Sequence, residues 1–321
     1  MKRSEVVVGN ILRITLIVMA VFLVSCSGNP AAGRNPQDTE AILREVQTGT
    51  QGVEISVVPN YPPTTLYDQN QFIALVEVKN RGNHDLDLQD CFIQMAGFDT
   101  NIIKGVQPIH SCAENLGELE GKNVYNTEGG FNQIEFSSSD ISLPSGVFDY
   151  NPRLNFLACY NYQTRTSPLI CVDPLLFQVT AEQKSCQPRD VGMGGGQGAP
   201  VGVSYVGVDM VGSKAVFEID VQNFGTGRVL SPDADIRNCG QVALAYTDLD
   251  KVMYNVELSG GSLIDCKPLD RIVRLNNNHG KIVCSFDIQG GAAFETPLLV
   301  NLDYGYIQSF VKPMKIIQTP Q

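Results

Sequence analysis

Two stretches of this chain share the pattern that decides its fold: FIALVEVKNRG at residues 72–82 and AVFEIDVQNFG at residues 215–225. In both stretches, every second residue is apolar, and the run is followed by Asn, any residue and Gly. Alternation with a period of two is typical of a β-strand that buries one face. The two copies lie 143 residues apart. The sequence therefore predicts a duplicated β domain.

Further matches at nearly the same spacing support the duplication. The tripeptide YNY at residues 160–162 aligns with YGY at residues 304–306, and Pro168 aligns with Pro313. Between the copies lies the glycine-rich segment 191–200, whose composition is typical of a linker. Alternate residues of a strand share one face, so we expect the tyrosines of each pair to pack in a core or corner rather than to bind sugars.

The fold class follows from this pattern as all-β, with two tandem immunoglobulin-like antiparallel β-sandwiches after an N-terminal signal or anchor segment. Beyond the leader, no long stretch carries an apolar face at helical spacing. A short helix is expected at residues 36–46, with Asn35 as its cap, in a spacer. The expected domains are a signal peptide or anchor (1–25), the spacer (26–50), the first sandwich (51–190), the linker (191–200) and the second sandwich (201–321).

The N-terminal segment has the features of a bacterial lipoprotein leader. Basic residues precede an apolar run that starts at Ile14 and ends in LVSC at residues 23–26. The run has the length of a signal-peptide core and is shorter than the roughly 20 residues that span a bilayer. Cleavage would leave Cys26 as the lipidated first residue. The alternative is an uncleaved single-pass anchor over residues 6–25. Both place the remaining chain on the extracytoplasmic side of the membrane, at the cell surface.

The eight other cysteines are expected to form disulfide bonds, because an even number suits an oxidising compartment. None lies in a C-x-x-C or C-x-x-H arrangement, and three histidines are too few to complete a zinc site. We favour the pairs Cys171–Cys186 and Cys266–Cys284. The partners of the other four stay open: Cys91, Cys112, Cys159 and Cys239.

One alternative pairing and one counting argument bear on the open cysteines. A hairpin centred near Arg165 would bring Cys159 and Cys171 to the same face, in competition with the favoured pair. Five of the eight cysteines precede the linker and three follow it. If all of them pair, either one bridge joins the two halves or Cys186 belongs to the second half.

Charge and motifs exclude several classes of function. The formal net charge is −11, and the chain has no long basic cluster, so no nucleic-acid partner is expected. The sequence contains no G-x-S-x-G and no H-E-x-x-H, and no motif nominates a catalytic residue, a metal ligand or a cofactor site. The glycines at 192–198 lack the strand and helix context of a phosphate-binding loop. Paired aspartates at 85/87, 233/235 and 248/250 are expected to be turn residues, with loop-bound calcium as the alternative.

Two of the quoted motifs resemble a known module. VEVKNRG at residues 76–82 and IDVQNFG at residues 219–225 are similar to the V-x-V-x-N-x-G second strand of CARDB-type immunoglobulin-like modules. The passages 49–63, 160–174 and 196–200 also resemble uncharacterised archaeal and bacterial membrane-anchored surface proteins. The resemblance implies a β-sandwich that serves as a spacer or adhesion module, with no activity. Each repeat is longer than such a module, so an insertion such as 103–132 is not explained by the resemblance.

Together these features predict a membrane-anchored extracytoplasmic structural or adhesion protein that is not an enzyme. Its expected partners are the membrane, through a lipid or an anchor helix, and a protein or envelope component. A secreted hydrolase, or an accessory domain of one with a site between the domains, is the first alternative. A subunit of a surface filament or envelope assembly is the second alternative. The sequence names no ligand.

Overall fold

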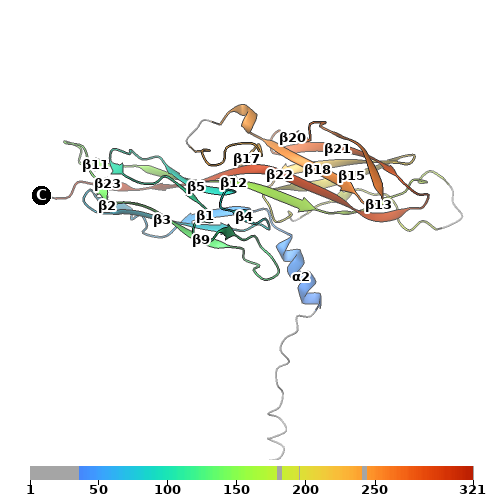
Figure 1. Cartoon of the computed structure of the whole chain (residues 1–321), viewed down its shortest axis with the longest axis horizontal. Coiled ribbons are helices and arrows are strands. Elements are labelled where there is room, and N and C mark those ends of the chain that lie inside the picture. Colours follow the sequence, from blue (N-terminus) through green and yellow to red (C-terminus); the bar gives the residue numbers. More distant parts are fainter. Residues whose placement is uncertain (1–35, 179–182, 195, 241–243, 321) are drawn as a thin grey trace, which may run out of the picture. The chain divides into compact units, whose positions relative to one another are not determined.

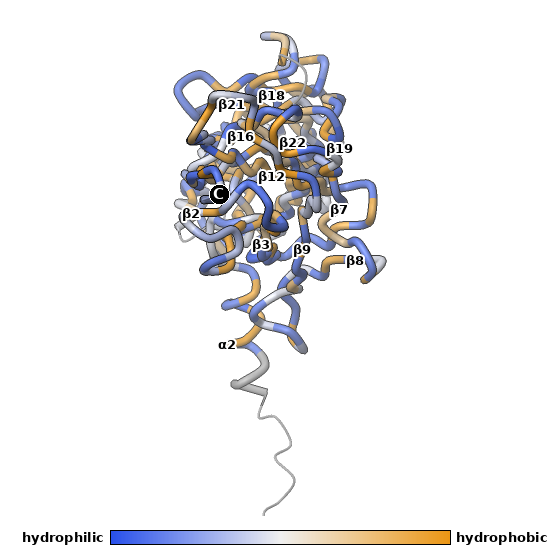
Figure 2. The backbone as a smooth tube through the Cα atoms, turned by 90° about the vertical axis from the view of Figure 1, so that its left-hand side faces the viewer, coloured by the Kyte–Doolittle hydropathy of each residue, from blue (hydrophilic) through white to orange (hydrophobic). Residues whose placement is uncertain are grey.

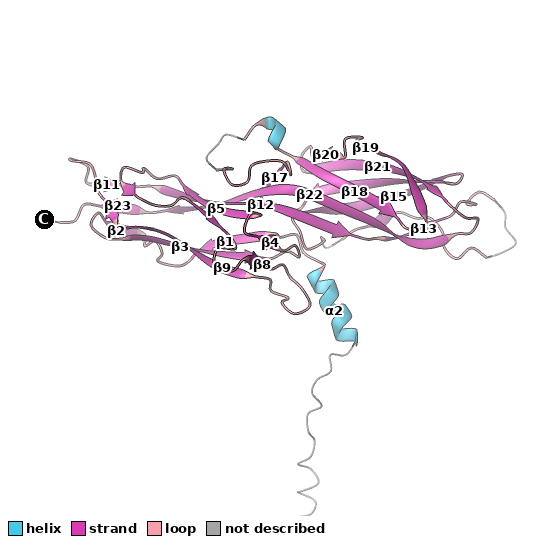
Figure 3. Cartoon of the chain, in the orientation of Figure 1, coloured by secondary structure: helices cyan, strands magenta, loops and turns pink. Residues whose placement is uncertain are grey.

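β-Strands form nearly all of the regular structure in this computed structural model (Figures 1 and 3). The structure describes residues 36–178, 183–194, 196–240 and 244–320. The helix α2 spans Pro36–Val46, as the sequence predicts. Its expected cap Asn35 and the whole leader, including Cys26, lie outside the described residues. Within the described ranges, no helix has both the length and the apolar character needed to cross a membrane.

In the described ranges the strands follow one another along the chain, with the short 3-10 helix η1 (Tyr246–Asp248) among them. In chain order they are β1 (Val53–Val57), β2 (Thr65–Tyr67), β3 (Phe72–Asn80), β4 (Leu86–Asp87), β5 (Cys91–Ala96), β6 (Ile103–Lys104), β7 (Ile109–Ser111), β8 (Glu118–Leu119), β9 (Phe131–Ser138), β10 (Asp140–Ile141), β11 (Asp149–Tyr150), β12 (Arg153–Thr166), β13 (Leu169–Val172), β14 (Val191–Gly192), β15 (Val201–Val211), β16 (Lys214–Asn223), β17 (Arg228–Leu230), β18 (Lys251–Leu258), β19 (Gly261–Lys267), β20 (Ile272–Arg274), β21 (His279–Ile288), β22 (Phe294–Pro313) and β23 (Lys315–Ile317).

Three sheets contribute most of the core, and every pairing within them is antiparallel. The largest has eight strands in the order β20-β18-β22-β12-β5-β7, with β13 and β17 also paired to β22. The others are β1-β3-β9 and β14-β15-β16-β21-β19. Along β3 and β16, buried and partly exposed residues alternate, so the predicted period of two is confirmed. Short hydrophobic and hydrophilic stretches follow one another along the tube in Figure 2. Most of the buried hydrophobic residues of the three sheets belong to one large hydrophobic cluster.

The strands β12 and β22 form the longest ladder. They pair antiparallel over the whole length of β12, and the same register continues into β13. The hairpin predicted near Arg165 is therefore wrong. Thr164 is buried and Arg165 is exposed, so the alternation of an extended strand continues through the polar residues that suggested a turn.

The ends of both long strands pair with strands from the other half of the sequence. The strand that follows β12 in the sequence, β13, pairs with the start of β22. The strand that follows β22, β23, pairs with β2 and β11. Residues 42–321 form one compact unit. The glycine-rich segment between the copies contributes β14, and its residues 196–200 are buried. The division into two domains at 191–200 stays a prediction.

A tyrosine explains why the first repeated motif ends in Asn-x-Gly. The Tyr162 hydroxyl donates to Asn80 Oδ1 (3.1 Å), and the Gly82 N–H donates to the same oxygen (3.3 Å). Asn80 Nδ2 donates to the carbonyl oxygens of His84 (2.7 Å) and Leu119 (3.1 Å). A Cβ atom at position 82 would collide with the Tyr162 oxygen. Glycine is therefore required where the hydroxyl approaches the backbone.

The second motif is built in the same way. The Tyr306 hydroxyl donates to Asn223 Oδ1 (3.1 Å), and the Gly225 N–H donates to that oxygen as well (3.1 Å). Asn223 Nδ2 donates to the carbonyl of Gly227 (3.0 Å), and a Cβ at position 225 would again meet the tyrosine oxygen. We refer to Asn80 with Tyr162 and Asn223 with Tyr306 as the two Asn–Tyr latches.

Candidate functional site

Four disulfide bonds join the eight cysteines of the described chain. Two are the pairs that the sequence favours, Cys171–Cys186 and Cys266–Cys284. The other two are Cys91–Cys112 and Cys159–Cys239. Disulfide bonds persist in oxidising compartments, so this pairing is typical of an extracytoplasmic protein.

The Cys159–Cys239 bond ties a loop to the outer face of the largest sheet and joins the two halves of the sequence. Around it, the side-chain amide of Gln94 donates to the Arg237 carbonyl (2.7 Å), and the Gly240 N–H donates to the amide oxygen of Gln94 (3.0 Å). A separate small hydrophobic cluster surrounds the bond, with Phe92 and Ile236 as members. The bond therefore anchors a packed loop. The alternative pairing of Cys159 with Cys171 is wrong, because each of them is bonded to another cysteine.

The four repeated tyrosines form a buried cluster, as the packing interpretation predicts. Tyr160, Tyr304 and Tyr306 are at most 1% exposed, and the ring centroids of Tyr160 and Tyr306 lie 5.6 Å apart. Burial raises the pKa of Tyr306 to about 12 and the pKa values of Tyr160 and Tyr304 well above 10. These rings are inaccessible to a sugar and serve as core.

The paired aspartates behave as turn and surface residues. Asp235 accepts hydrogen bonds from the Arg237 N–H (3.0 Å) and the Asn238 amide (2.8 Å), and Asp250 pairs with Arg228 (3.1 Å). Asp85 accepts from the Gly121 N–H (2.7 Å). Among the residues that the structure describes, no three His, Cys, Asp or Glu side chains come together as metal ligands.

The histidines do not form a nucleophile pair. His110 Nδ1 lies 2.7 Å from Glu114 Oε2, and the His84 ring packs edge-on against Tyr162. In the described ranges, the hydrogen bonds of the histidine rings include none to a serine, threonine or cysteine side chain. A Ser–His or Cys–His arrangement is thus missing from this part of the chain.

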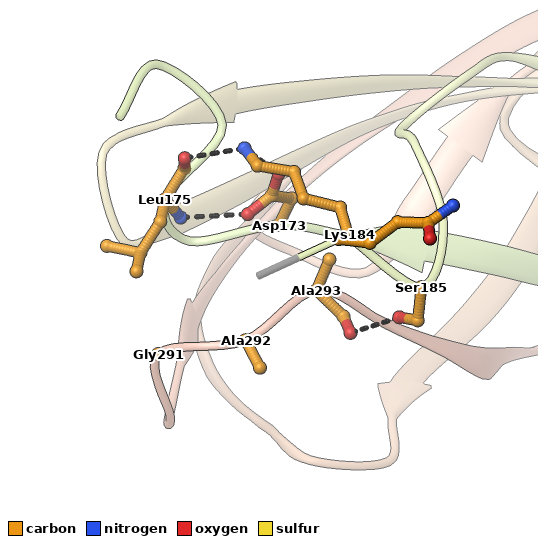
Figure 4. A pocket seen from close by; sticks show the side chains of 8 residues that line it. Asp173, Leu175, Lys184, Ser185, Gly291, Ala292 and Ala293 are labelled. Carbon is orange, nitrogen blue, oxygen red and sulfur yellow. Dashed lines mark hydrogen bonds and ion pairs between the residues drawn. The ribbon is translucent and has the colours of Figure 1, made fainter. Parts of the chain in front are cut away.

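One small cavity of about 130 Å³ is lined by a partly buried ion pair (Figure 4). Lys184 Nζ lies 2.6 Å from Asp173 Oδ2, and the Asp173 side chain is only 1% exposed. The same ammonium donates to the carbonyl oxygens of Leu175 (2.7 Å) and Leu176 (3.1 Å). An ammonium has three N–H donors, and here each has an acceptor.

This arrangement is suited to holding a loop rather than to catalysis. A lysine that acts as a base needs a free electron pair directed at a reacting proton, and three protein acceptors leave none available. The neighbouring Ser185 hydroxyl donates to the Ala293 carbonyl and not to Lys184 (Figure 4). No sequence pattern indicates this ion pair, because its two members are eleven residues apart and belong to no recognisable motif.

Two other cavities are larger. One of about 220 Å³ lies at the start of β1, beside Phe224, Tyr306 and Gln308. The other, of about 630 Å³, lies between β13 and β14 and is lined by Leu169, Gly192 and Glu295, among others. We call the second one the β13–β14 groove. Its walls combine strand backbone, apolar side chains and charged side chains.

Comparisons with known proteins add little to this geometry. No protein-family model matches the sequence, and no curated protein matches it. Among solved structures, the secreted serine protease VesC from Vibrio cholerae is similar at a TM-score of 0.20 and 11% sequence identity. The match covers 88% of this chain and 54% of the protease, so this chain spans about half the length of that protein. A similarity this weak carries no argument about fold or activity.

Proposed function

We propose that this protein is a membrane-anchored, extracytoplasmic structural or adhesion protein without catalytic activity, and that it consists of two tandem immunoglobulin-like β-sandwiches. The observation that carries the proposal is the set of four disulfide bonds, because such bonds are typical of proteins exported to an oxidising compartment. The lipobox-like sequence at residues 23–26 supplies a matching export and anchoring signal.

The tandem immunoglobulin-like organisation is supported by the two Asn–Tyr latches. In immunoglobulin-like sandwiches a tyrosine hydroxyl often bonds to the backbone a few residues upstream. Here the tyrosine hydroxyl bonds instead to an asparagine side chain 82 or 83 residues upstream, and this contact occurs twice, with Asn80 and Asn223 at matching places in β3 and β16. A duplicated module of this kind explains why two distant motifs share both sequence and contacts.

The proposal of a non-catalytic role is supported by the way the polar groups are used. The Lys184 ammonium donates to Asp173 and to two backbone carbonyls. The tyrosines of the central cluster are buried in the core. Lys184 and the clustered tyrosines therefore serve the packing of the fold.

The anchoring proposal is tested by mass spectrometry of the full chain purified from membranes under non-reducing conditions. We expect an N-terminal peptide that starts at Cys26 and carries diacylglycerol on its sulfur, together with the four disulfide-linked peptide pairs. The variant Cys26→Ser should lose the lipid and remain unprocessed, whereas Cys266→Ser should keep it. An unmodified N-terminus at Met1 would favour the single-pass anchor, and eight free thiols would contradict the extracytoplasmic location.

A further inference from the structure

The β13–β14 groove is bounded by two strands that each have one unpaired side. Strand β13 pairs with β22, and β14 pairs with β15. Neither has a second strand partner within the described residues. An unpaired strand side presents a row of free N–H and C=O groups, which is a template for one more strand.

The register shows which backbone groups of β13 are free. The Leu298 N–H donates to the Pro168 carbonyl (3.0 Å), so residues 168 and 298 form a hydrogen-bonded pair. In an antiparallel ladder, alternate residues direct their backbone groups to opposite sides. The N–H and C=O groups of Leu169 and Cys171 therefore point away from β22. Both residues line the groove.

The same reasoning applies to the opposite wall. The Met193 N–H donates to the Ser204 carbonyl on β15 (2.9 Å). The preceding residue, Gly192, must then direct its N–H and C=O away from β15. Gly192 lines the groove, is exposed and carries no side chain that would cover these groups. Within the described residues, both walls of the groove thus carry peptide groups that have no backbone partner.

The walls are held in place by links that do not depend on an occupant. Cys171 is bonded to Cys186, which fixes the loop between the two strands to β13. Asp190 accepts a hydrogen bond from the Val208 N–H (3.0 Å) and another from the Tyr205 hydroxyl. A site that is already ordered loses less conformational entropy when a partner binds.

We infer that the β13–β14 groove binds an extended peptide segment of a partner protein, which is added to β13 as a further strand. This inference rests on the proposed function and names the class of partner that the protein would bind. Strand addition obtains its affinity from main-chain hydrogen bonds and its specificity from pockets for alternate side chains. Leu169, which is 58% exposed, offers an apolar contact for such a side chain.

Charge favours a peptide with basic residues. The charged side chains lining the groove are Arg189, Asp190 and Glu295, which gives an excess of one carboxylate. The whole chain carries a formal net charge of −11. Complementary charge increases the rate of encounter and selects against acidic segments. A lysine placed near Glu295 would add a charge-assisted contact.

The test uses the full chain in a non-ionic detergent and a short fluorescein-labelled peptide of alternating lysine and valine, followed by fluorescence anisotropy. We expect saturable binding that is lost when alternate peptide nitrogens are methylated. The variant Leu169→Pro removes the free N–H of residue 169. The ladder to β22 does not use this N–H, and proline is tolerated at strand edges, so the variant should keep the fold. Binding should weaken about five- to tenfold relative to Leu169→Ala, which keeps the N–H.

A matched control comes from the other long strand. Val311 occupies an edge position of β22 that pairs only with β12, and its N–H also points away from that partner. Val311→Pro should therefore bind the peptide like the parent protein. Glu295→Gln should weaken binding of the lysine peptide but not of a version with serine in place of lysine.

Three results would overturn the inference. They are an absence of saturable binding up to about 1 mM peptide, equal affinity of Leu169→Pro and Leu169→Ala, and equal loss in Leu169→Pro and Val311→Pro. None of these results depends on the lipid at Cys26, so a failure of the groove is distinguishable from a failure of the anchoring proposal. Conversely, an unmodified N-terminus leaves peptide binding unaffected.

Discussion

Replacement of Asn80 by alanine should destabilise the protein strongly, because one fully buried amide satisfies four polar groups. Its oxygen accepts from the Tyr162 hydroxyl and the Gly82 N–H, and its nitrogen donates to two backbone carbonyls. Each hydrogen bond contributes about 1 kcal/mol, and buried groups left unpaired cost at least as much. We expect Asn80→Ala to lower the free energy of unfolding by about 4 kcal/mol.

The second latch provides an internal comparison. Asn223 makes three hydrogen bonds of 3.1 Å or less, so Asn223→Ala should cost about 3 kcal/mol. The exposed side chain of Asn255 donates to Glu257 (2.8 Å), so Asn255→Ala should change the stability by less than about 0.5 kcal/mol.

Urea unfolding followed by far-ultraviolet circular dichroism measures these differences. A double-mutant cycle of Asn80→Ala with Tyr162→Phe should give a coupling energy of about 1 kcal/mol, because the two side chains share a hydrogen bond. A loss in Asn80→Ala no greater than that in Asn255→Ala would refute the assignment of the Asn-x-Gly motif as a latch.

Three further perturbations test other parts of the structure. Gly82→Ala places a Cβ against the Tyr162 oxygen and the Gly198 carbonyl and should cost about 3 kcal/mol, whereas Gly194→Ala meets open space and should be nearly neutral in the same urea assay. Removal of Cys159–Cys239, which closes 80 residues, should cost about 4.5 kcal/mol, against about 3 kcal/mol for Cys171–Cys186, which closes 15; equal losses in paired Cys→Ala variants would contradict this. Burial lowers the pKa of His84, so the folded state favours the neutral ring. The stability contributed by the neutral His84 ring is present above the unfolded pKa of about 6.5 and is lost as the pH falls below that value. The melting midpoint should therefore fall more between pH 7.5 and pH 5.5 in the parent than in His84→Gln. Equal decreases in the two proteins would contradict a role of His84 in the pH dependence of stability.

The features that the sequence predicted correctly depend on local patterns. The strands β3 and β16 follow from a period of two that is visible within about ten residues. The helix at Pro36–Val46 follows from its start signals. The pairs Cys171–Cys186 and Cys266–Cys284 close short loops, which the spacing alone makes favourable.

The features that the sequence did not predict depend on contacts between distant residues. Arg165 and its polar neighbours suggest a turn, but β22 supplies a partner that keeps the chain extended. Cys159 pairs across 80 residues, and Gln94, an ordinary polar residue in the sequence, holds the loop around that bond. The β13–β14 groove is formed by residues from three separate segments, and only the ladder registers reveal which of their peptide groups are free.

The β12–β22 ladder couples the two latches, because it carries the tyrosine of each. Tyr162 lies on β12 and Tyr306 lies on β22, and these strands pair along the whole of β12. A shift of either strand by one residue would turn its tyrosine to the opposite face and break its latch. Each latch therefore helps to fix the β12–β22 register, and the other latch forms only in that register. The same register sets which groups of β13 stay unpaired, so the latches in the core determine whether the groove can accept a strand.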